Sequence, residues 1–345
     1  MTNITQGKAN IITDSVKLYA LNSAALTKFY QDTIGLTLIE EKENNYYTLG
    51  TPDQKVLLEI EQTDVAKDAE STGLYHLAFL LPTYEDLGTI LRHIIVSQYP
   101  LTGASNHGYS NAIYLQDPED NGIEIYWDKD ESEWDIQEDG SIVGITEMMD
   151  AEAALEAASP TFDGMPNGTT MGHVHLHIDD LEAAVEFYTE VMGLGLKYRY
   201  GPAALFLASG DYHHHLGANV WKQGQLDHPT DKSQGMAYTK WTGSDTDLNY
   251  VEAELKARDI TFDKTEEADR KIVEEVGKVA EKHGTTRAQI ALGWLWEKGV
   301  VAPIVGVTKE KYLDDFMGAM KVKLDPEDID NLEKHYTPHE LVGPK

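Results

Sequence analysis

The chain has 345 residues, of which 41% are hydrophobic and 25% charged, a balance typical of a globular protein with one large domain or two domains. Its formal net charge of -31 makes nucleic acid and anionic membranes poor partners, because both require a basic protein surface. It contains no cysteine, so disulfides and thiolate metal sites are excluded, and any metal must be held by histidine and carboxylate side chains.

The N-terminal stretch MTNITQGKANIITDSVKLYA has no apolar run long enough for a signal peptide. No later segment approaches the length of a membrane-spanning helix. We therefore expect a cytoplasmic protein.

The first predicted elements are repeated later in the chain. Residues 15–36, SVKLYALNSAALTKFYQDTIGL, resemble residues 173–194, HVHLHIDDLEAAVEFYTEVMGL. Each copy predicts a strand with alternating apolar residues and then an amphipathic helix that ends at Gly35 or Gly193. Further short alternating stretches follow, YYTLG and KVLLEIEQ in the first copy and ALFLASG and YHHHLGANVW in the second. Each copy therefore predicts a βαβββ unit.

Two more units of this shape are indicated. One runs from GLYHLAFLLP (73–82) through the helix YEDLGTILRHIIVSQ to NAIYLQ and GIEIYWDK. The other begins at GMAYTKWTGS (235–244) and continues into the helix-like DLNYVEAELKARD, but the three strands that should follow are missing. The fourth unit is thus predicted to be truncated.

Four βαβββ units in two pairs, with HVHLHI beginning the third, resemble the vicinal-oxygen-chelate superfamily of glyoxalases and extradiol dioxygenases. The stretches GLYHLAFLLP, YLQDPEDNGIEIYWD, GHVHLHI and YHHHLGANVW are most similar to catechol-2,3-dioxygenase-like members. The resemblance implies an α+β fold in which two paired units form a cup around a divalent metal. We expect a first pair at 1–135 (cup 1), a linker at 136–168 and an incomplete second pair at 169–265 (cup 2).

Residues 266–345 follow a different pattern and predict a mainly helical α/β tail. An amphipathic helix stops at Gly284, Thr286 caps a second helix, and a short strand APIVGV and two more helices follow. RAQIALGWL, APIVGVTK and YTPHELVG resemble the C-terminal end of aldo-keto reductases. That resemblance covers about two βα units and none of the family's catalytic residues, so neither NADP nor reductase activity is expected.

For cup 1, the resemblance to extradiol enzymes implies two histidines and one carboxylate around Fe(II) or Mn(II). The corresponding positions hold Ser15, His76 and Glu124. Because a neutral hydroxyl binds iron weakly, Glu59 is an alternative third ligand, and the set Glu59, His76 and Glu124 would suit a hard cation such as Mn(II) or Ni(II). His76 could instead be a hydrogen-bonded core residue.

For cup 2, the corresponding positions hold His173 and Tyr238, and the carboxylate strand is absent. The alternation HVHLH places His173, His175 and His177 on one side of a strand. The run YHHH would place His213 and His215 together, facing the same cup. These imidazoles predict a second candidate metal site, or else a polar core.

His107 and Tyr109 are the candidate catalytic residues, because the resemblance suggests that His107 faces cup 1 and its imidazole titrates near neutral pH. The leading hypothesis is an extradiol dioxygenase-like metalloprotein acting on a catechol-type substrate and dioxygen, with activity impaired or altered by the fusion. The alternatives are a glyoxalase-like metalloenzyme that does not use oxygen, and a non-catalytic binding module or fusion product. An unfinished sheet edge also predicts a homodimer.

Overall fold

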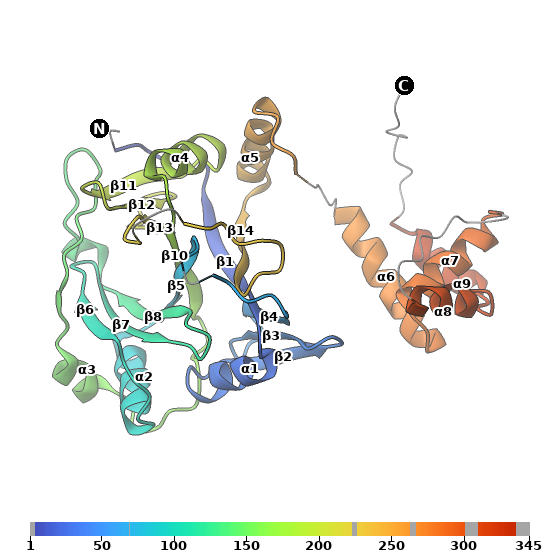
Figure 1. Ribbon diagram of the computed structural model, residues 1–345, viewed down its shortest axis with the longest axis horizontal. Coiled ribbons are helices and arrows are strands. Elements are labelled where there is room, and N and C mark those ends of the chain that lie inside the picture. The colour runs from blue at the N-terminus through green and yellow to red at the C-terminus, as the bar shows by residue number, and fades with distance from the viewer. Residues whose placement is uncertain (1–3, 69, 223–225, 263–266, 301–309, 336–345) are drawn as a thin grey trace. The chain divides into compact units, whose positions relative to one another are not determined.

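The computed structural model describes residues 4–68, 70–222, 226–262, 267–300 and 310–335 (Figure 1). The chain divides into two compact units, Met1–Ile260 and Thr261–Lys345. No helix in the described ranges is both long and apolar enough to cross a membrane.

The first unit is built from the predicted repeats of a strand, a helix and three strands (Figure 1). The first repeat contains β1 (Ile11–Ala20), α1 (Ser23–Asp32), β2 (Thr37–Lys42), β3 (Tyr46–Gly50) and β4 (Val56–Gln62). The second contains β5 (Gly73–Leu80), α2 (Tyr84–Val96), β6 (Gly103–Asn106), β7 (Ser110–Gln116) and β8 (Gly122–Asp128). The third contains β10 (Thr170–His177), α4 (Leu181–Glu186), the π-helical turn η2 (Phe187–Val191), β11 (Gly195–Tyr200), β12 (Ala204–Ala208) and β13 (Leu216–Asn219).

The fourth repeat is truncated, as predicted. It consists of β14 (Gly235–Gly243) and α5 (Asp245–Ala257), and residues 258–262 form no strand. A long connection between β8 and β10 contains η1 (Glu131–Glu133), β9 (Glu147–Met148) and α3 (Ala151–Ala157). Because α5 ends the repeat, its three remaining strands are absent from the described residues of this unit.

Short polar side chains start the helices of this unit. Asn22, Thr83, Asp180 and Ser244 each accept a hydrogen bond from a backbone N–H in the first turn of α1, α2, α4 and α5 respectively. Such caps satisfy N–H groups that have no partner within the helix. The helix expected to begin at Tyr84 therefore starts directly after a capping residue, Thr83.

The strands form two sheets, and the pairing of repeats differs from the expected one. Five strands follow the order β14-β1-β4-β3-β2, and nine follow the order β11-β12-β13-β10-β5-β8-β7-β6-β9. The second repeat thus pairs with the third through antiparallel β5 and β10, and the first pairs with the remnant of the fourth through β1 and β14. The expected cups, made from repeats one and two and from repeats three and four, are not formed. All four repeats begin with similar strands, so the strand pattern alone does not determine which two will pair.

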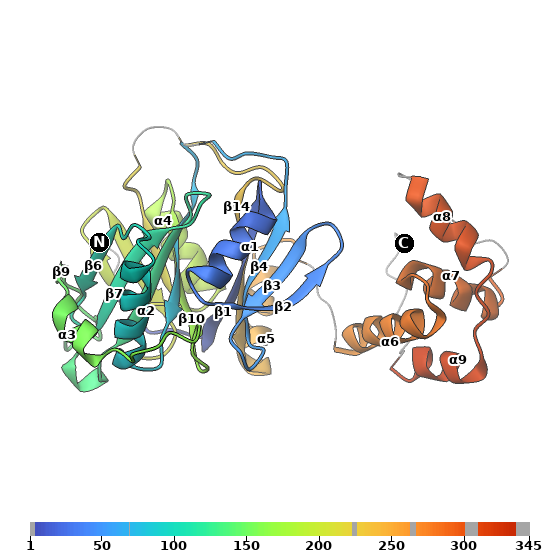
Figure 2. The same ribbon diagram turned by 90° about the horizontal axis from the view of Figure 1, so that it is seen from below.

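Both sheets contribute to one hydrophobic core in the first unit. Helix α1 packs against β3 and β4, and α2 packs against β8 (Figure 2). The buried apolar side chains of β1, β4, β5, β8 and β10 belong to a single cluster. The nine-stranded sheet contains every strand of repeats two and three. The five-stranded sheet contains only one strand of repeat four among the described residues.

The second unit is helical in its described residues. It contains α6 (Glu267–His283), α7 (Arg287–Glu297), α8 (Glu310–Ala319) and α9 (Pro326–Glu333). Gly284 adopts a positive φ of 59° after α6, and Thr286 caps α7, as predicted. The predicted strand APIVGV, residues 302–307, lies outside the described residues. A small separate core contains Val279, Ala280, Ile290 and Leu332.

Candidate metal centre and cavity

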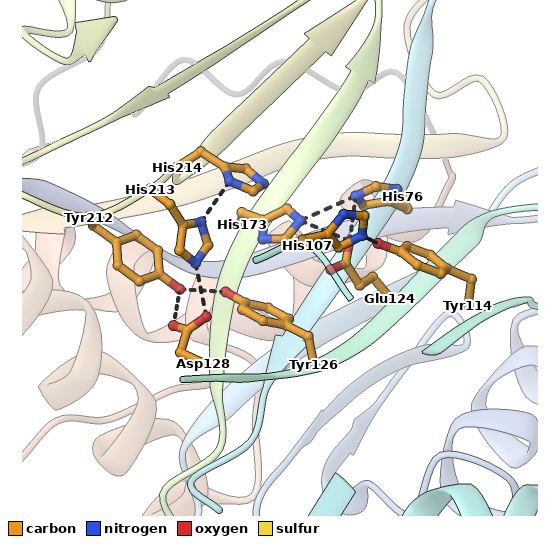
Figure 3. A network of polar contacts seen from close by, with 10 residues as sticks. All are labelled: His76, His107, Tyr114, Glu124, Tyr126, Asp128, His173, Tyr212, His213 and His214. Atoms are coloured by element: carbon orange, nitrogen blue, oxygen red, sulfur yellow. Dashed lines mark hydrogen bonds and ion pairs between the residues drawn. The ribbon is translucent and has the colours of Figure 1, made fainter. Parts of the chain in front are cut away.

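Three buried side chains meet inside the nine-stranded sheet (Figure 3). His76 lies on β5, Glu124 on β8 and His173 on β10. The two Nε2 atoms of the histidines are 3.2 Å apart, and Glu124 Oε2 lies 3.1 Å from His76 Nε2 and 3.2 Å from His173 Nε2. Within the described part of the chain, these residues are the one group of three such donors close enough to hold a metal ion.

The spacing of these donor atoms fits a single bound cation. Donors about 2.0–2.2 Å from one ion lie roughly 3–3.5 Å apart. The observed separations of 3.1 and 3.2 Å fall in this range, so one ion could contact all three side chains. Two histidines and one carboxylate on a single face would leave further positions open, which is the arrangement typical of non-haem Fe(II) oxygenases.

The charges of the three residues also suit a divalent cation. Burial opposes ionisation of Glu124, but His173 and His76 together outweigh it and hold the pKa of that carboxyl well below its ordinary value. Burial lowers the pKa of His173, so that its imidazole is neutral at neutral pH. A carboxylate and a neutral imidazole are the forms in which these side chains bind metals.

Two β-bulges between β5 and β10 determine how the histidines are presented. Met171 pairs with Phe79 and His173 pairs with Ala78, so Gly172 is an extra residue on β10. A Cβ atom on Gly172 would lie 1.8 Å from the hydroxyl oxygen of Tyr126, so only glycine fits. Bulges commonly reorient side chains beside functional sites, and this one directly precedes His173.

The second bulge has its extra residue on β5. His175 pairs with His76 and Leu176 pairs with Leu74, which leaves Tyr75 unpaired. Tyr75 therefore departs from strict alternation, and its ring lies 5.0 Å from that of His76. Both residues line the same cavity.

A cavity of about 1180 Å³ opens beside the triad. His76 and Glu124 line it, together with aromatic side chains from both of the paired repeats. These aromatic residues are Tyr75, Tyr109, Tyr114, Tyr198, Tyr200, Phe206 and Trp221. A large cavity with aromatic walls and a few convergent polar groups is the usual form of a small-molecule site.

His107 and Tyr114 form a hydrogen-bonded pair at the edge of this cavity (Figure 3). His107 Nδ1 lies 2.9 Å from the carbonyl oxygen of Ile145, which can only accept, so Nδ1 carries the proton in the neutral ring. His107 Nε2 then accepts a hydrogen bond from the Tyr114 hydroxyl, 2.6 Å away. Burial and the nearby Glu124 raise the pKa of Tyr114 well above its ordinary value, so this hydroxyl remains protonated.

A second chain of hydrogen bonds approaches the triad from the other side (Figure 3). Asp128 Oδ1 accepts from His213 Nε2 at 2.9 Å, while Asp128 Oδ2 accepts from the Tyr212 hydroxyl at 2.8 Å. His213 Nδ1 lies 2.7 Å from His214 Nδ1, and the ring of His214 lies 4.1 Å from that of His173. Because Asp128 fixes the proton of neutral His213 on Nε2, His214 must donate from Nδ1, and its Nε2 keeps a lone pair.

The cup 1 candidates separate between the two sheets. Glu59 lies on β4 of the five-stranded sheet, where it accepts hydrogen bonds from Tyr46 and Tyr238, and it is not part of the triad. Ser15 lies on β1 in that same sheet. The predicted set of Glu59, His76 and Glu124 is therefore not assembled, because it assumed that repeats one and two pair.

The cup 2 candidates on β10 lie in the same sheet as His76. His173 joins His76 and Glu124, and His175 and His177 line the cavity from the same strand, as their alternation predicted. His175 is buried beside His76, with ring centroids 5.0 Å apart, but its donor atoms lie outside the triad. The predicted separation of these histidines from His76 was wrong, since the third repeat pairs with the second.

The alternation expected for YHHH fails. Residues 212–215 precede β13 and have irregular backbone, so His213 and His215 do not share a face of a strand. His213 bonds to Asp128, and His215 Nδ1 accepts from the backbone N–H of Ser209, whereas His214 lines the cavity. The sequence pattern did not identify His214 or Tyr114 as candidates. The run of three histidines could have indicated His214.

Tyr109, the other catalytic candidate, lines the cavity, and its ring packs against the rings of neighbouring side chains. Its ring stacks on His213, with ring centroids 4.2 Å apart. Burial raises the pKa of its hydroxyl above the ordinary value. Tyr109 thus helps to hold His213 beside His214.

Comparison with known proteins finds relatives of the first unit. Residues 13–125 match the family Glyoxalase/Bleomycin resistance protein/Dioxygenase superfamily, and residues 170–201 match the Bleomycin resistance protein-like N-terminal family. A catechol-2,3-dioxygenase of Bacillus subtilis (strain 168) is 35% identical over 249 residues, which cover 70% of this chain and 87% of that protein. Glyoxalase I from Zea mays is a solved structure with 15% identity and a TM-score of 0.44, covering 72% of this chain and 81% of that one.

The C-terminal part matches a different family. Residues 232–337 match the Aldo/keto reductase family. Versiconal hemiacetal acetate reductase of Aspergillus parasiticus is 36% identical over 72 residues, which cover 21% of each protein. The family match begins upstream of β14, although β14 pairs with β1 inside the first unit.

Proposed function

The chain belongs to the glyoxalase, bleomycin resistance protein and dioxygenase superfamily, and from this premise we propose that it is a metal-dependent extradiol dioxygenase that cleaves a catechol-type ring. The observation that carries the proposal is the facial group of His76, Glu124 and His173 beside an aromatic cavity. The similarity to a catechol-2,3-dioxygenase supports the choice of substrate and of dioxygen as co-substrate. All three of these residues belong to the first unit.

His76, Glu124 and His173 would hold the metal, for which we propose Fe(II) or Mn(II). The chemistry that such an ion supplies when bound is adjacent open positions at which a catecholate and dioxygen can meet. The remaining steps depend on side chains of this chain.

His214 is suited to take a proton from a catechol hydroxyl. It lines the cavity next to His173, and its hydrogen bond to His213 leaves Nε2 as the basic atom. Burial lowers the pKa of His214 well below its ordinary value, so the ring is neutral and its Nε2 can accept a hydrogen bond from the hydroxyl. The carboxylate of Asp128 stabilises the chain of imidazoles when that proton arrives.

His107 and Tyr114 lie on the opposite side of the triad from His214, where they are suited to bind the oxygen atoms of a ligand. The Tyr114 hydroxyl donates to His107 Nε2, and both residues line the cavity. If His107 takes up a proton, both of its ring nitrogens become donors, and the Tyr114 hydroxyl is then released to donate to a bound ligand. The pair can thus deliver one proton to an anionic oxygen.

The proposal is tested by metal content and oxygen consumption. Full-length protein is loaded with Fe(II) or Mn(II) without oxygen, and metal is then measured beside catechol-dependent oxygen uptake. We expect about one metal ion per chain, lost in His76→Ala and His173→Ala and retained in Glu59→Gln, because Glu59 lies in the other sheet. Metal retained in both histidine variants would overturn the proposed centre. Metal binding without oxygen uptake would instead favour a glyoxalase-like reaction.

A further inference from the structure

The cavity is larger than a single catechol ring requires. Its volume is about 1180 Å³. Pockets of about 300–1,000 Å³ already enclose drug-sized molecules of several rings. A catechol bound beside His76 and Glu124 would therefore leave most of the cavity unfilled, and the rest of the lining indicates what else the substrate carries.

Two side chains, Tyr75 and Trp221, form an aromatic corner in the lining of the cavity. Their ring centroids lie 5.3 Å apart, and their planes are inclined at 89°. Both residues line the cavity, where 38% of Tyr75 and 46% of Trp221 remain exposed. Aromatic surface that is left open inside a cavity is available to a ligand. A third ring placed in the corner can stack on one of these rings and meet the other edge-on, and aromatic pairs prefer both arrangements.

The aromatic corner adjoins the metal centre. The ring centroid of Tyr75 lies 5.0 Å from that of His76, which belongs to the triad. One further ring contact, of 5.3 Å, leads from Tyr75 to Trp221. A second ring attached to a catechol at the triad would consequently reach the corner.

Neighbouring residues hold the two rings of the corner in place. Tyr75 is the extra residue of the bulge in β5, and it lines the same cavity as the adjacent His76. The buried ring of His175 lies 5.2 Å from the ring of Tyr75 and 5.5 Å from that of Trp221. His177, on the same strand as His175, lies 4.8 Å from Tyr75. Because these contacts exist without a ligand, little ordering of the corner is required when a ring binds.

The lining does not select for a charged substituent. Lys67 lines the cavity, but so do the carboxylates of Glu119 and Asp120. Charges of both signs are therefore present, and neither an anion nor a cation is favoured by the lining as a whole. Tyr75 and Trp221 instead offer uncharged aromatic faces, which match an uncharged ring.

We infer that Tyr75 and Trp221 bind a second, uncharged ring carried by the substrate, so that the preferred substrate is an aryl-substituted catechol rather than catechol itself. This inference rests on the proposed function for the position of the ring that is cleaved. It adds a subsite, and with it a substrate class, to the same cavity.

The experiment compares 3-phenylcatechol and 4-phenylcatechol with the methylcatechols of the same substitution. The full-length, Fe(II)-loaded protein is used under oxygen, and kcat and KM are measured separately. We expect kcat/KM to favour at least one of the phenyl compounds by about tenfold, since contacts between aromatic rings add this much to binding. Equal kcat/KM for phenyl and methyl compounds at both positions would overturn the subsite.

Variants of the corner test which residues cause this preference. In Tyr75→Leu and in Trp221→Leu the preference should fall by about fivefold through KM, with kcat for the methylcatechols unchanged. Tyr75→Phe keeps the ring and should retain the preference. Tyr238→Leu is the matched control, because it removes a tyrosine with a similar exposure of 44% from β14 in the five-stranded sheet.

Metal content is measured for every variant, because Tyr75 is next to the ligand His76. If Tyr75→Leu fails to hold metal, Trp221→Leu still decides the matter, since Trp221 lies on another segment and adjoins no residue of the triad. A preference that is unchanged in metal-loaded Trp221→Leu, or reduced equally in Tyr238→Leu, would contradict the aromatic corner.

Anaerobic binding of the same compounds to the metal-loaded protein separates this inference from the proposed function. Tighter binding of a phenylcatechol that is lost in Trp221→Leu, without turnover, would support the subsite while contradicting the dioxygenase function. Turnover of phenyl and methyl compounds with equal kcat/KM in the parent protein and in all variants would overturn the subsite and leave the function intact.

Discussion

His215 shows how this site constrains the charge of its histidines. Burial, aided by the neighbouring His213, lowers the pKa of His215 to about 3. Its Nδ1 accepts a hydrogen bond from the backbone N–H of Ser209 at 3.2 Å, which requires a lone pair on that nitrogen. His175 and His214 are also held neutral by burial, with pKa values well below the ordinary one.

The stability of the metal-free protein should therefore fall as the pH drops below about 6.5. Between that pH and the lowered pKa values of the folded state, the unfolded chain binds more protons than the folded one, so acid favours unfolding. Each such histidine contributes up to about 1.4 kcal/mol per pH unit. Urea denaturation of metal-free protein from about pH 7.5 to about pH 5 measures this slope.

A matched pair of variants identifies the source of that slope. His215→Gln removes one buried histidine, so it should make the decline in unfolding free energy with falling pH shallower. His228→Gln removes a histidine whose side chain is 70% exposed beside Asp179, and it should leave the slope unchanged. Equal slopes in both variants and in the parent protein would contradict a role for the buried imidazoles.

Within individual strands, the sequence correctly predicted which side chains share a face wherever the backbone is regular. Alternation in β10 correctly placed His173, His175 and His177 on one side, and the same period in β8 places Glu124, Tyr126 and Asp128 on one face of that strand. Residues 212–215 broke the rule because they lie before β13 rather than in it. Hydrogen bonds to Asp128 and Ser209 orient those side chains, and Asp128 lies far away in the sequence.

We expect the β-bulge at Gly172 to tolerate no residue larger than glycine. A Cβ atom there would meet the Tyr126 hydroxyl oxygen at 1.8 Å and ring carbons of Tyr126 at 2.6 and 2.8 Å. Gly172→Ala should lower the free energy of unfolding by about 1–3 kcal/mol, the usual cost of overpacking. It should also weaken metal binding, since His173 is the next residue. Urea denaturation and metal titration measure the two effects.

Gly103→Ala is the control for that substitution. Gly103 begins β6, and a Cβ atom there would meet its nearest neighbour, a ring carbon of Tyr114, at an ordinary 3.8 Å. We expect a change in stability within about 0.5 kcal/mol and unaltered metal affinity. If Gly172→Ala were tolerated as well as Gly103→Ala, the bulge would not be what positions His173.

Across the whole molecule, the sequence identified the repeats but not their partners. Repeats one to three carry similar strand and helix patterns, and each first strand can pair with the first strand of any other repeat. The candidate ligands were consequently assigned to two separate cups, whereas β5 and β10 bring His76 and His173 together. This pairing also means that the truncation of repeat four affects the five-stranded sheet, while the sheet that holds the triad remains complete.

The two units should therefore differ in stability and in importance for activity. Residues Met1–Ile260 contain the triad, the cavity and one extensive core, whereas the described helices of Thr261–Lys345 share a core of four buried apolar residues. So small a core supplies little stability. Calorimetry should show a weak transition at low temperature before the main one, and a chain ending at Ile260 should lose the first while retaining metal and turnover. Loss of metal binding on truncation would show that the second unit supports the site, because no residue of the triad would have been removed.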